Sequence, residues 1–440
     1  MILVLVVIFS FNAAAFANPN MLFQQARVHF DRQQYSLAHE AISKGLHATQ
    51  DASEKLNMGN FLLNIANVYY LNGQIKNAHT IFQELHDLFP SSHAILYSLG
   101  LALNELADYK TARNVFRKAL QKKPDAIDIQ EFLATVELAL GNYEDGWQLY
   151  ESRWKKPERL AFKMPCPNWD GRSTLINKKV VLINEGALGD CIQFIRYAQL
   201  IKTAGAYVIM QAPPSLKQLL SLCPFIDKII LNINEIDRCD YYASLMSLPA
   251  HFKTTLSTMP NTIPYLSCDS NLKTFWQKHI DSTMFNIGVC WQADVQNDAN
   301  RPPLAKRAVP IELFDALAQL PNVKLYSLQK SITPPPFMHD FGSTLDTTAG
   351  AFMDSAAIIT NLDLVISVDT SIAHLSGALG IPTWVILPFK ADWRWLENDI
   401  FYSPWYPTMK LFRKKENEDW QSVIHQIKKE LEHKIEKDSS

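Results

Sequence analysis

The sequence lacks an excess of charge of either sign. Its 42 Lys and Arg residues nearly balance its 44 Asp and Glu residues, which gives a formal net charge of −2. Composition therefore does not indicate a nucleic-acid partner, because such proteins concentrate positive charge. Apolar residues are not scarce, since 48% of the 440 residues are hydrophobic and 20% are charged. These proportions are typical of a globular protein with two or three domains.

Cysteine is also scarce, and its spacing is uninformative. The chain has no Cys-x-x-Cys pair and no Cys/His spacing of the kind that binds zinc. We therefore expect reduced, mostly buried thiols and neither a zinc site nor a disulfide scaffold, which favours the cytoplasm. The six cysteines are Cys166, Cys191, Cys223, Cys239, Cys268 and Cys290.

Basic residues are absent from the start of the chain, where the first Lys or Arg is Arg27. Residues 1–19 form an apolar N-terminal segment, and Ala15-Phe16-Ala17 has the pattern of a signal-peptidase site. The apolar run is short for a bilayer, so no integral membrane span is expected. A start at Met21 or a hydrophobic first helix would also explain it. We predict a cytoplasmic protein, with export or membrane association through this segment as the alternative.

A repeat of 34 residues occupies residues 20–154. Four columns of residues recur at this interval, which is the period of tetratricopeptide repeats. They are Ala78, Ala112 and Gly146; Phe82, Phe116 and Tyr150; Tyr109 and Tyr143; and Pro90 and Pro124. An earlier unit, with Tyr35, Ala38 and Ile42, precedes the next by 40 residues, so we expect a longer turn around Thr49–Lys55.

The sequence thus predicts an α-helical solenoid of four tetratricopeptide units. Stacked units of this kind leave a concave groove that usually binds a polypeptide. We therefore expect the groove to recruit a protein or glycan acceptor or another partner. The alternative is that the helices only support the following domain or mediate dimerisation.

The pattern changes after a linker at residues 155–177 that is rich in Pro and Lys. Short apolar strands then alternate with helical patterns in two series, residues 178–275 and 280–440. We predict two Rossmann-like α/β domains facing a cleft, with ligand at the carboxyl ends of the strands. The predicted strands are 179–184, 206–210, 227–231, 286–291, 323–328, 364–368 and 383–387, and the predicted helices are 191–204, 311–320, 351–360, 371–379 and 419–437.

The most informative segment, residues 363–380, is a buried strand that runs directly into a helix. Asp369, Thr370 and Ser371 stand at the junction, and His374 follows one turn later. The first amides of a helix lack internal partners and carry the positive end of its dipole, so such a junction binds phosphate. The alternatives are that Asp369 and Thr370 only cap the helix and that His374 is structural.

A glycine loop, Glu185 to Asp190, follows the first strand of the α/β region. Gly186 and Gly189 would let the backbone approach a ligand. Asp190 either caps the next helix or faces the cleft as a general base. The loop is not Gly-x-Gly-x-x-Gly, and the chain has no dinucleotide fingerprint, so no cofactor is expected.

Further ligand contacts are predicted at the edge of the second series. Gln329 would contact a base or ribose, and Lys330, Lys306 and Arg307 are candidates for phosphate, although basic residues are commonly just solvated. No Asp-x-Asp triplet occurs, so helix ends and cations, rather than a metal ion, would hold a diphosphate. The aromatic motifs at 392–395 and 403–407 either stack on a sugar or plug the core between the two domains, and we favour the plug.

In combination, these motifs resemble bacterial tetratricopeptide-repeat glycosyltransferases. Such proteins are similar to the heptosyltransferase-like enzymes of family 9 and, more distantly, to O-linked N-acetylglucosamine transferases. The resemblance implies a GT-B fold and a nucleotide-sugar donor held mainly by the C-terminal half without a metal. It implies donor contacts at Gln329, Asp369, Thr370, Ser371 and His374 and an acceptor-side carboxylate at Asp190. The segments that carry it are 184–197, 245–249, 287–291, 327–329, 368–380 and 392–395.

We therefore predict a metal-independent glycosyltransferase that moves a sugar from a nucleotide sugar to a protein or glycan acceptor recruited by the repeats. The competing interpretation is a non-catalytic scaffold, in which the repeats bind partners and the α/β region binds a nucleotide sugar or is degenerate.

Overall fold

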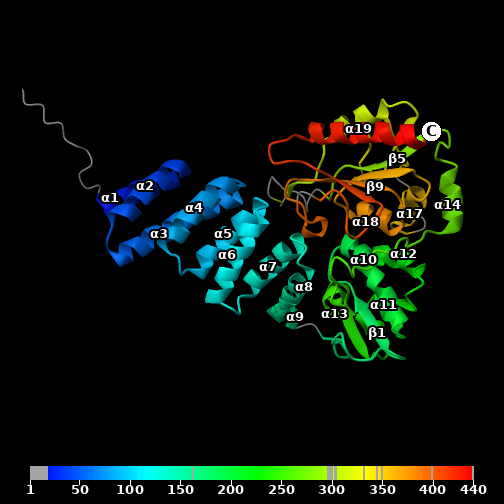
Figure 1. Cartoon of the computed structure of the whole chain (residues 1–440), viewed down its shortest axis with the longest axis horizontal. Helices are drawn as coiled ribbons and strands as arrows, with labels where there is room; N and C mark the ends of the chain where they lie inside the picture. The colour runs from blue at the N-terminus through cyan, green and yellow to red at the C-terminus, as the bar shows by residue number, and fades with distance from the viewer. Residues whose placement is uncertain are drawn as a thin grey trace, which may run out of the picture. The chain divides into compact units, whose positions relative to one another are not determined.

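The computed structural model describes residues 18–160, 163–294, 301, 305–330, 332–342, 345–347, 350–397 and 400–438. The predictions for residues 1–17 therefore lie outside the described residues. Two compact units divide the chain: Met1–Leu106 with Asn114–Pro124, and Ala107–Arg113 with Asp125–Ser440 (Figure 1). Of the described helices, none combines the length and the apolarity that crossing a bilayer requires.

The N-terminal region consists of successive helix pairs, as the 34-residue period predicts. They are α1 (Pro19–Asp31) and α2 (Tyr35–Ala48), α3 (Ala52–Leu71) and α4 (Ile75–Leu88), α5 (His93–Glu105) and α6 (Tyr109–Lys122), and α7 (Ile127–Ala139) and α8 (Tyr143–Tyr150). The aromatic residue of the repeat packs against a small residue of the paired helix. A Cβ at Gly100 would lie 2.5 Å from the Phe116 ring, so the ring fills the space that the glycine leaves. The four predicted units are confirmed.

The extra residues of the first interval do not form a longer turn, so that expectation is wrong. Only residues 49–51 separate α2 from α3, and α3 has 20 residues where α5 and α7 have 13 each. The helix begins early because Asp51 accepts a hydrogen bond from the Glu54 amide at 2.8 Å. Thr49 also donates to the Glu54 carboxylate at 2.7 Å. These contacts form an N-cap, so the insertion lengthens the helix.

The first α/β half contains a parallel sheet of four strands in the order β3-β2-β1-β4. The strands are β1 (Lys179–Ile183), β2 (Tyr207–Gln211), β3 (Lys228–Ile230) and β4 (Tyr241–Ser244). The helices are α10 (Leu188–Phe194), α11 (Ala198–Thr203), α12 (Lys217–Ser221) and α13 (Leu248–His251). The predicted helix at 191–204 is interrupted by a 3-10 turn, Ile195–Tyr197, and begins three residues earlier, directly after the glycine loop.

The second half contains a parallel sheet of six strands in the order β10-β9-β8-β5-β6-β7. Its strands are β5 (Phe285–Cys290), β6 (Val323–Ser327), β7 (Met338–His339), β8 (Leu364–Val368), β9 (Thr383–Leu387) and β10 (Met409–Arg413). Its helical elements are α14 (Ser270–Gln277), η7 (Ile311–Phe314), α16 (Asp315–Ala318), α17 (Met353–Ile359), α18 (Ser371–Ala378), η8 (Trp393–Trp395) and α19 (Trp420–Asp438). The two predicted Rossmann-like halves are confirmed, whereas β4, β7 and β10 were not predicted.

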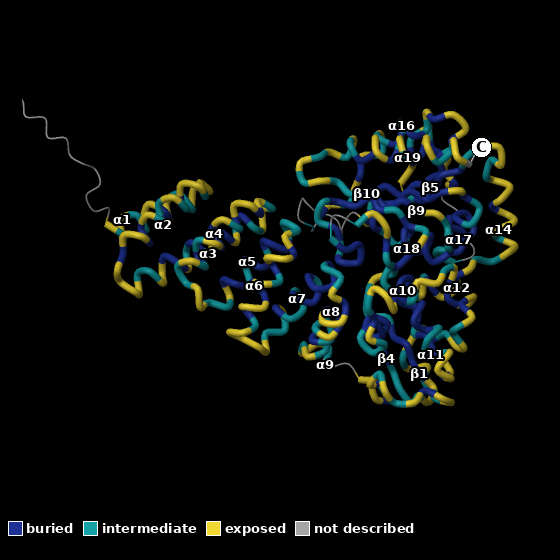
Figure 2. The backbone as a smooth tube through the Cα atoms, viewed as in Figure 1, coloured by how far each residue is buried: buried dark blue, intermediate teal, exposed yellow. Residues whose placement is uncertain are grey.

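The central strands of the second sheet are buried (Figure 2). All five residues of β8 and all five of β9 are buried, as expected of parallel strands covered on both faces. The apolar stripe of α19 packs into this core through Val423, Ile424 and Ile427. The predicted C-terminal helix therefore covers the sheet.

Two of the six cysteines form a disulfide, Cys166–Cys239, so the expectation of six reduced thiols is wrong. The bond ties the segment that follows the repeats to the start of β4. Backbone contacts reinforce this attachment: Trp169 donates to the Tyr242 carbonyl at 2.8 Å, and Tyr242 donates to the Pro167 carbonyl at 3.0 Å. Sequence spacing could not reveal the pair, because the 73-residue separation is closed only by the fold. Disulfides are typical of oxidising compartments, whereas the cytoplasmic location remains a prediction.

A count of reactive thiols tests this bond. Alkylation of the denatured chain without reductant is expected to modify Cys191, Cys223, Cys268 and Cys290 only. Prior reduction is expected to expose Cys166 and Cys239 as well. Mass spectrometry distinguishes the two states, and six modified thiols without reductant would contradict the bond. Repeating the count on protein fractionated from its native cell tests the compartment at the same time.

Candidate functional site

Two strand-to-helix junctions, one from each half, meet in the second compact unit. β1 leads through the glycine loop into α10, and β8 leads through Asp369 and Thr370 into α18. Helices α10 and α18 contact each other. A Cβ at Gly189 would lie 3.0 Å from Cδ2 of His374 and 3.7 Å from Cα of Ser371. The glycine therefore permits the close approach of the two junctions, and the structure brings these predicted residues together.

The N-cap residue of α18 makes no side-chain hydrogen bond to the first turn of the helix. Thr370, at the N-cap position, turns its hydroxyl back toward the strands, where it lies 3.1 Å from Ser367 Oγ and 3.7 Å from Cys290 Sγ. The alternative that Thr370 caps the helix is therefore not what the structure shows. Amides without a cap at a helix N-terminus are suited to an anion.

Asp369 and Arg307 are adjacent beside this turn. Arg307 donates to the Asp369 carbonyl at 2.7 Å, and its guanidinium lies 3.9 Å from Asp369 Oδ2. Burial raises the pKa of the Asp369 carboxyl, the negative charge of Asp392 raises it further, and Arg307 opposes both effects. Of the two predicted phosphate candidates in this segment, Arg307 is thus at the junction, and Lys306 is exposed.

His374 is buried in the angle between α18 and the aromatic motifs. Its Nδ1 lies 3.0 Å from the Tyr406 hydroxyl, and its ring stacks on Trp395 at 5.5 Å between centroids. Burial, followed by the nearby charge of Arg394, lowers the pKa of His374 to about 3. The imidazole is therefore neutral at ordinary pH and carries no positive charge at the junction.

Asp190 is both a capping residue and one half of an ion pair. Its Oδ2 accepts a hydrogen bond from the Ala187 amide at 2.7 Å, and its Oδ1 accepts one from Arg394. Arg394 belongs to the second half of the α/β region and also donates to Gln193 at 2.8 Å and to Asp392 at 2.7 Å. The capping alternative for Asp190 is therefore present in the structure, and the ion pair joins the two halves.

Asp392 completes this charged cluster. Burial disfavours its charged form, but the charge and hydrogen bonds of Arg394 outweigh burial and hold the pKa of Asp392 below its usual value. Arg394 lies within the aromatic motif at 392–395, and the sequence predicts no role for it. The available signal was an arginine within a run of aromatic residues that were predicted to be buried, since arginine is seldom buried without partners.

Gln329 and Lys330 lie at the carboxyl end of β6, as predicted. Gln329 Oε1 accepts a hydrogen bond from the Gln292 amide at 3.3 Å and lies 3.5 Å from Cys290 Sγ. The same sulfur contacts Thr370, so Gln329 is linked to the α18 junction through one side chain. Gln329 and Lys330 also line a pocket of about 220 Å³.

The aromatic motifs form a core between the halves. Trp395 and Trp405 are fully buried, and Trp405 packs edge-on against Phe194 of α10 at 5.5 Å. Arg196 donates a hydrogen bond to the Trp405 carbonyl at 2.6 Å. These rings are occupied by protein contacts, which agrees with the plug rather than with sugar stacking.

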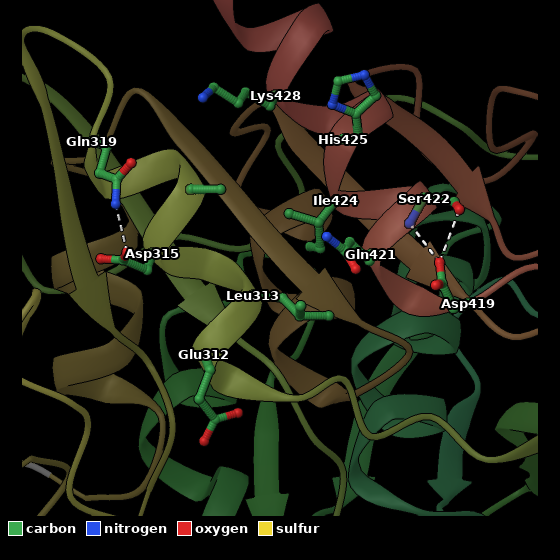
Figure 3. Close-up of a pocket in the computed structure, with 11 residues that line it drawn as sticks. Glu312, Leu313, Asp315, Gln319, Asp419, Gln421, Ser422, Ile424, His425 and Lys428 are labelled. Carbon is green, nitrogen blue, oxygen red and sulfur yellow. Dashed lines mark hydrogen bonds between the residues drawn. The ribbon is translucent and has the colours of Figure 1, made fainter.

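A second hollow lies away from the two junctions. It has a volume of about 550 Å³ and lies between η7 and α16 on one side and the start of α19 on the other (Figure 3). Its lining contains none of the predicted site residues. Among the residues that the structure describes, no three or more His, Cys, Asp or Glu side chains are grouped to hold a metal ion.

Comparison with known proteins supports the repeat assignment. The tetratricopeptide repeat family model matches residues 61–92, which include part of α3 and the whole of α4. Protein FlbA of Caulobacter vibrioides is 22% identical over 433 residues, covering 89% of this chain and 69% of that protein. The prediction of tetratricopeptide repeats is confirmed.

Two solved structures are similar to the α/β part. The glycosyl transferase family 9 protein from Veillonella parvula has 13% identity and a TM-score of 0.44, covering 59% of this chain and 97% of that one. The ADP-heptose lipopolysaccharide heptosyltransferase II of E. coli also has 13% identity and a TM-score of 0.44. The match covers 60% of this chain and 100% of that one.

The buried His374 gives a testable pH dependence. The native imidazole stays neutral, whereas the same histidine in the unfolded chain takes up a proton as the pH falls below its usual pKa of 6.5. Stability is therefore lost as the pH falls through this range, by ~2 kcal/mol between pH 7 and about pH 5 for this residue alone. Urea unfolding of His374→Gln is expected to lack this part of the loss.

The matched control is His425→Gln, which changes an exposed histidine on α19. It is expected to leave the pH profile of the unfolding free energy unchanged. An unaltered profile in His374→Gln would show that the ring is accessible to protons in the native state.

Proposed function

We propose that this protein is a glycosyltransferase that moves a sugar from a nucleotide-sugar donor to a hydroxyl group of a protein or glycan acceptor. The observation that carries the proposal is the uncapped first turn of α18, which faces the glycine loop of the other half. A diphosphate group fits this turn because free amides and a helix dipole stabilise negative charge. The resemblance of both junction sequences to those of nucleotide-sugar transferases supports the same interpretation.

In the proposed reaction, an acceptor oxygen forms a bond to the anomeric carbon while the bond from that carbon to the diphosphate oxygen breaks. The electron pair leaves with the nucleoside diphosphate, and the acceptor proton passes to a carboxylate. The α18 amides, Ser371 and Arg307 would stabilise the departing charge, and fixed dipoles of this kind are usually a large catalytic contribution. Gln329 would contact the base or ribose and Lys330 a phosphate, and the proposed reaction includes no metal ion.

Asp190 is the proposed proton acceptor. Its side chain is 21% exposed, and each carboxylate oxygen already accepts one hydrogen bond, which leaves further lone pairs for an acceptor hydroxyl. Gly186 lets the Asp190 side chain lie against the loop, since a Cβ added at Gly186 would be 2.7 Å from the Asp190 Cβ. Asp190→Asn is expected to keep donor binding and to lower turnover about 100-fold or more, because general-base catalysis typically contributes a factor of this size.

The second candidate is a scaffold that binds a nucleotide sugar without transferring it. One observation favours this candidate: Asp190 caps α10 and pairs with Arg394, so its interactions are those of a structural carboxylate as well. In this case the repeats would supply the function by binding a protein partner, and the α/β region would sense the nucleotide sugar.

Isothermal titration of the full chain with UDP-, GDP- and ADP-sugars, with and without EDTA, tests the proposal. One of these donors is expected to bind equally well in both conditions, and release of free nucleoside diphosphate is expected in a coupled assay with candidate acceptors. Binding without turnover on every acceptor would favour the scaffold. No binding of any nucleotide sugar would contradict both candidates.

A further inference from the structure

The glycine loop is held by two buried arginines that come from outside the first α/β half. Arg394, from the second half, binds Asp190 at the end of the loop. Arg153, from the end of the helical repeats, binds Glu185 at its beginning. The loop is thus fixed at both ends by separate parts of the chain, and the Arg153 contact lies outside the reaction described above.

Arg153 belongs to the 3-10 helix η1 (Glu151–Lys155), which continues directly from α8. Its side chain is 6% exposed, and so is that of Glu185. The pair is bidentate, since Nε donates to one Glu185 oxygen at 3.2 Å and a terminal nitrogen donates to the other at 2.5 Å. Two-point pairing of this kind fixes orientation as well as distance.

The remaining donors of the Arg153 guanidinium are also used. One terminal nitrogen donates to the Tyr150 carbonyl at 2.9 Å and to Glu151 at 2.6 Å. The other also donates to Ser247 Oγ at 2.8 Å. Arginine has five N–H groups, and all five of those of Arg153 donate hydrogen bonds. Lysine, with a single ammonium group, could not reproduce this geometry.

Glu185 is equally constrained. Besides Arg153 it accepts a hydrogen bond from Ser244, at the carboxyl end of β4, and it lies 3.2 Å from Arg159. The next residue, Gly186, lies against Asp190, because a Cβ added there would be 2.7 Å from the Asp190 Cβ. A displacement of Glu185 is therefore transmitted through Gly186 to Asp190.

We infer that Arg153 is a positioning residue of the transfer site: through Glu185 it fixes the glycine loop and thereby Asp190. The end of the repeat region then helps to position Asp190, in addition to recruiting partners. The inference rests on the proposed function for its kinetic consequence, whereas the fixing of the loop is independent of it. A purely structural pair would fasten α8 to the α/β region without affecting the loop.

The test is Arg153→Lys in the full chain, which keeps the positive charge and removes the bidentate pairing with Glu185. Hydrogen exchange in the peptide covering residues 183–192 is expected to become about tenfold faster while exchange in α1–α6 is unchanged, as a local opening requires. Turnover is expected to fall about tenfold, because the base is misplaced and small errors of position slow catalysis. The affinity for a nucleoside diphosphate, held by α18, is expected to stay within about twofold.

Arg159→Lys is the matched control. Arg159 contacts the same carboxylate, but its side chain is 36% exposed, so the change is expected to leave loop exchange and turnover within about twofold. If Arg153→Lys does not fold, the double variant Arg153→Met/Glu185→Gln removes both charges and leaves no buried ion without a partner. Its loop exchange is expected to be faster than that of the wild-type chain.

Unchanged loop exchange in whichever of these variants folds would overturn the inference, and so would acceleration spread evenly over the chain. If the wild-type chain proves to have no transferase activity, the proposed function fails, and the exchange measurement still decides whether Arg153 fixes the loop. If turnover exists and Arg153→Lys leaves it intact, the inference fails and the proposed function stands.

Discussion

Ser371→Glu is expected to weaken nucleoside-diphosphate binding at least ~100-fold, about 2.7 kcal/mol. A carboxylate in the first turn of α18 would occupy the uncapped amides and repel an incoming diphosphate at short range. The same charge interacts favourably with the helix dipole, so the folded state is expected to be as stable as the wild-type chain or up to ~1 kcal/mol more stable. Titration calorimetry and urea unfolding measure the two effects separately.

Ser371→Gln is the control for this substitution, because it has the same length without the charge. Its binding is expected to lie close to that of the wild-type chain, with at most a modest loss from crowding. Equal weakening by Gln and Glu would indicate a steric effect rather than repulsion. Undiminished binding in Ser371→Glu would place the diphosphate elsewhere.

Arg394→Met is expected to destabilise the α/β region by about 3–5 kcal/mol, because removal of this buried arginine leaves two partly buried carboxylates uncompensated. Asp190 and Asp392 both lose their guanidinium, and Gln193 loses a hydrogen bond. Urea unfolding monitored by tryptophan fluorescence reports on this region, since the Arg394 guanidinium lies 4.3 Å from the centroid of the buried Trp393 ring.

The control is Arg172→Met, which removes an exposed arginine and is expected to change stability little. Adding Asp190→Asn to Arg394→Met is expected to restore part of the loss, because one unpaired charge disappears. A loss of stability in Arg394→Met no larger than in Arg172→Met would mean that solvent, rather than the ion pair, stabilises these carboxylates.

Local chemistry explains which elements could be predicted from the sequence. The helices of the repeats follow from a 34-residue period, and strands such as Leu364–Val368 follow from continuous apolar runs between turns. The α18 junction could be located because a polar cluster interrupts such a run at the point where the strand ends. In each case the signal lies within a few neighbouring residues, or within one repeat, so no knowledge of the fold was needed.

The rest depends on contacts between distant residues. The disulfide joins Cys166 to Cys239 only because the linker runs beside β4. Arg394 meets Asp190 across 204 positions of the sequence. The roles of Arg153 and Glu185 were likewise hidden, since each alone looks like an ordinary surface charge. The direction of the Thr370 hydroxyl, away from the helix it precedes, also depends on the neighbouring strand.

Crystals of the full chain soaked with a nucleoside diphosphate would show where the diphosphate binds. We expect diphosphate density at the first turn of α18, within hydrogen-bond distance of the Ser371 and Ile372 amides and opposite Gly189. Density in the hollow beside α16 and α19, or anywhere else away from α18, would contradict this expectation.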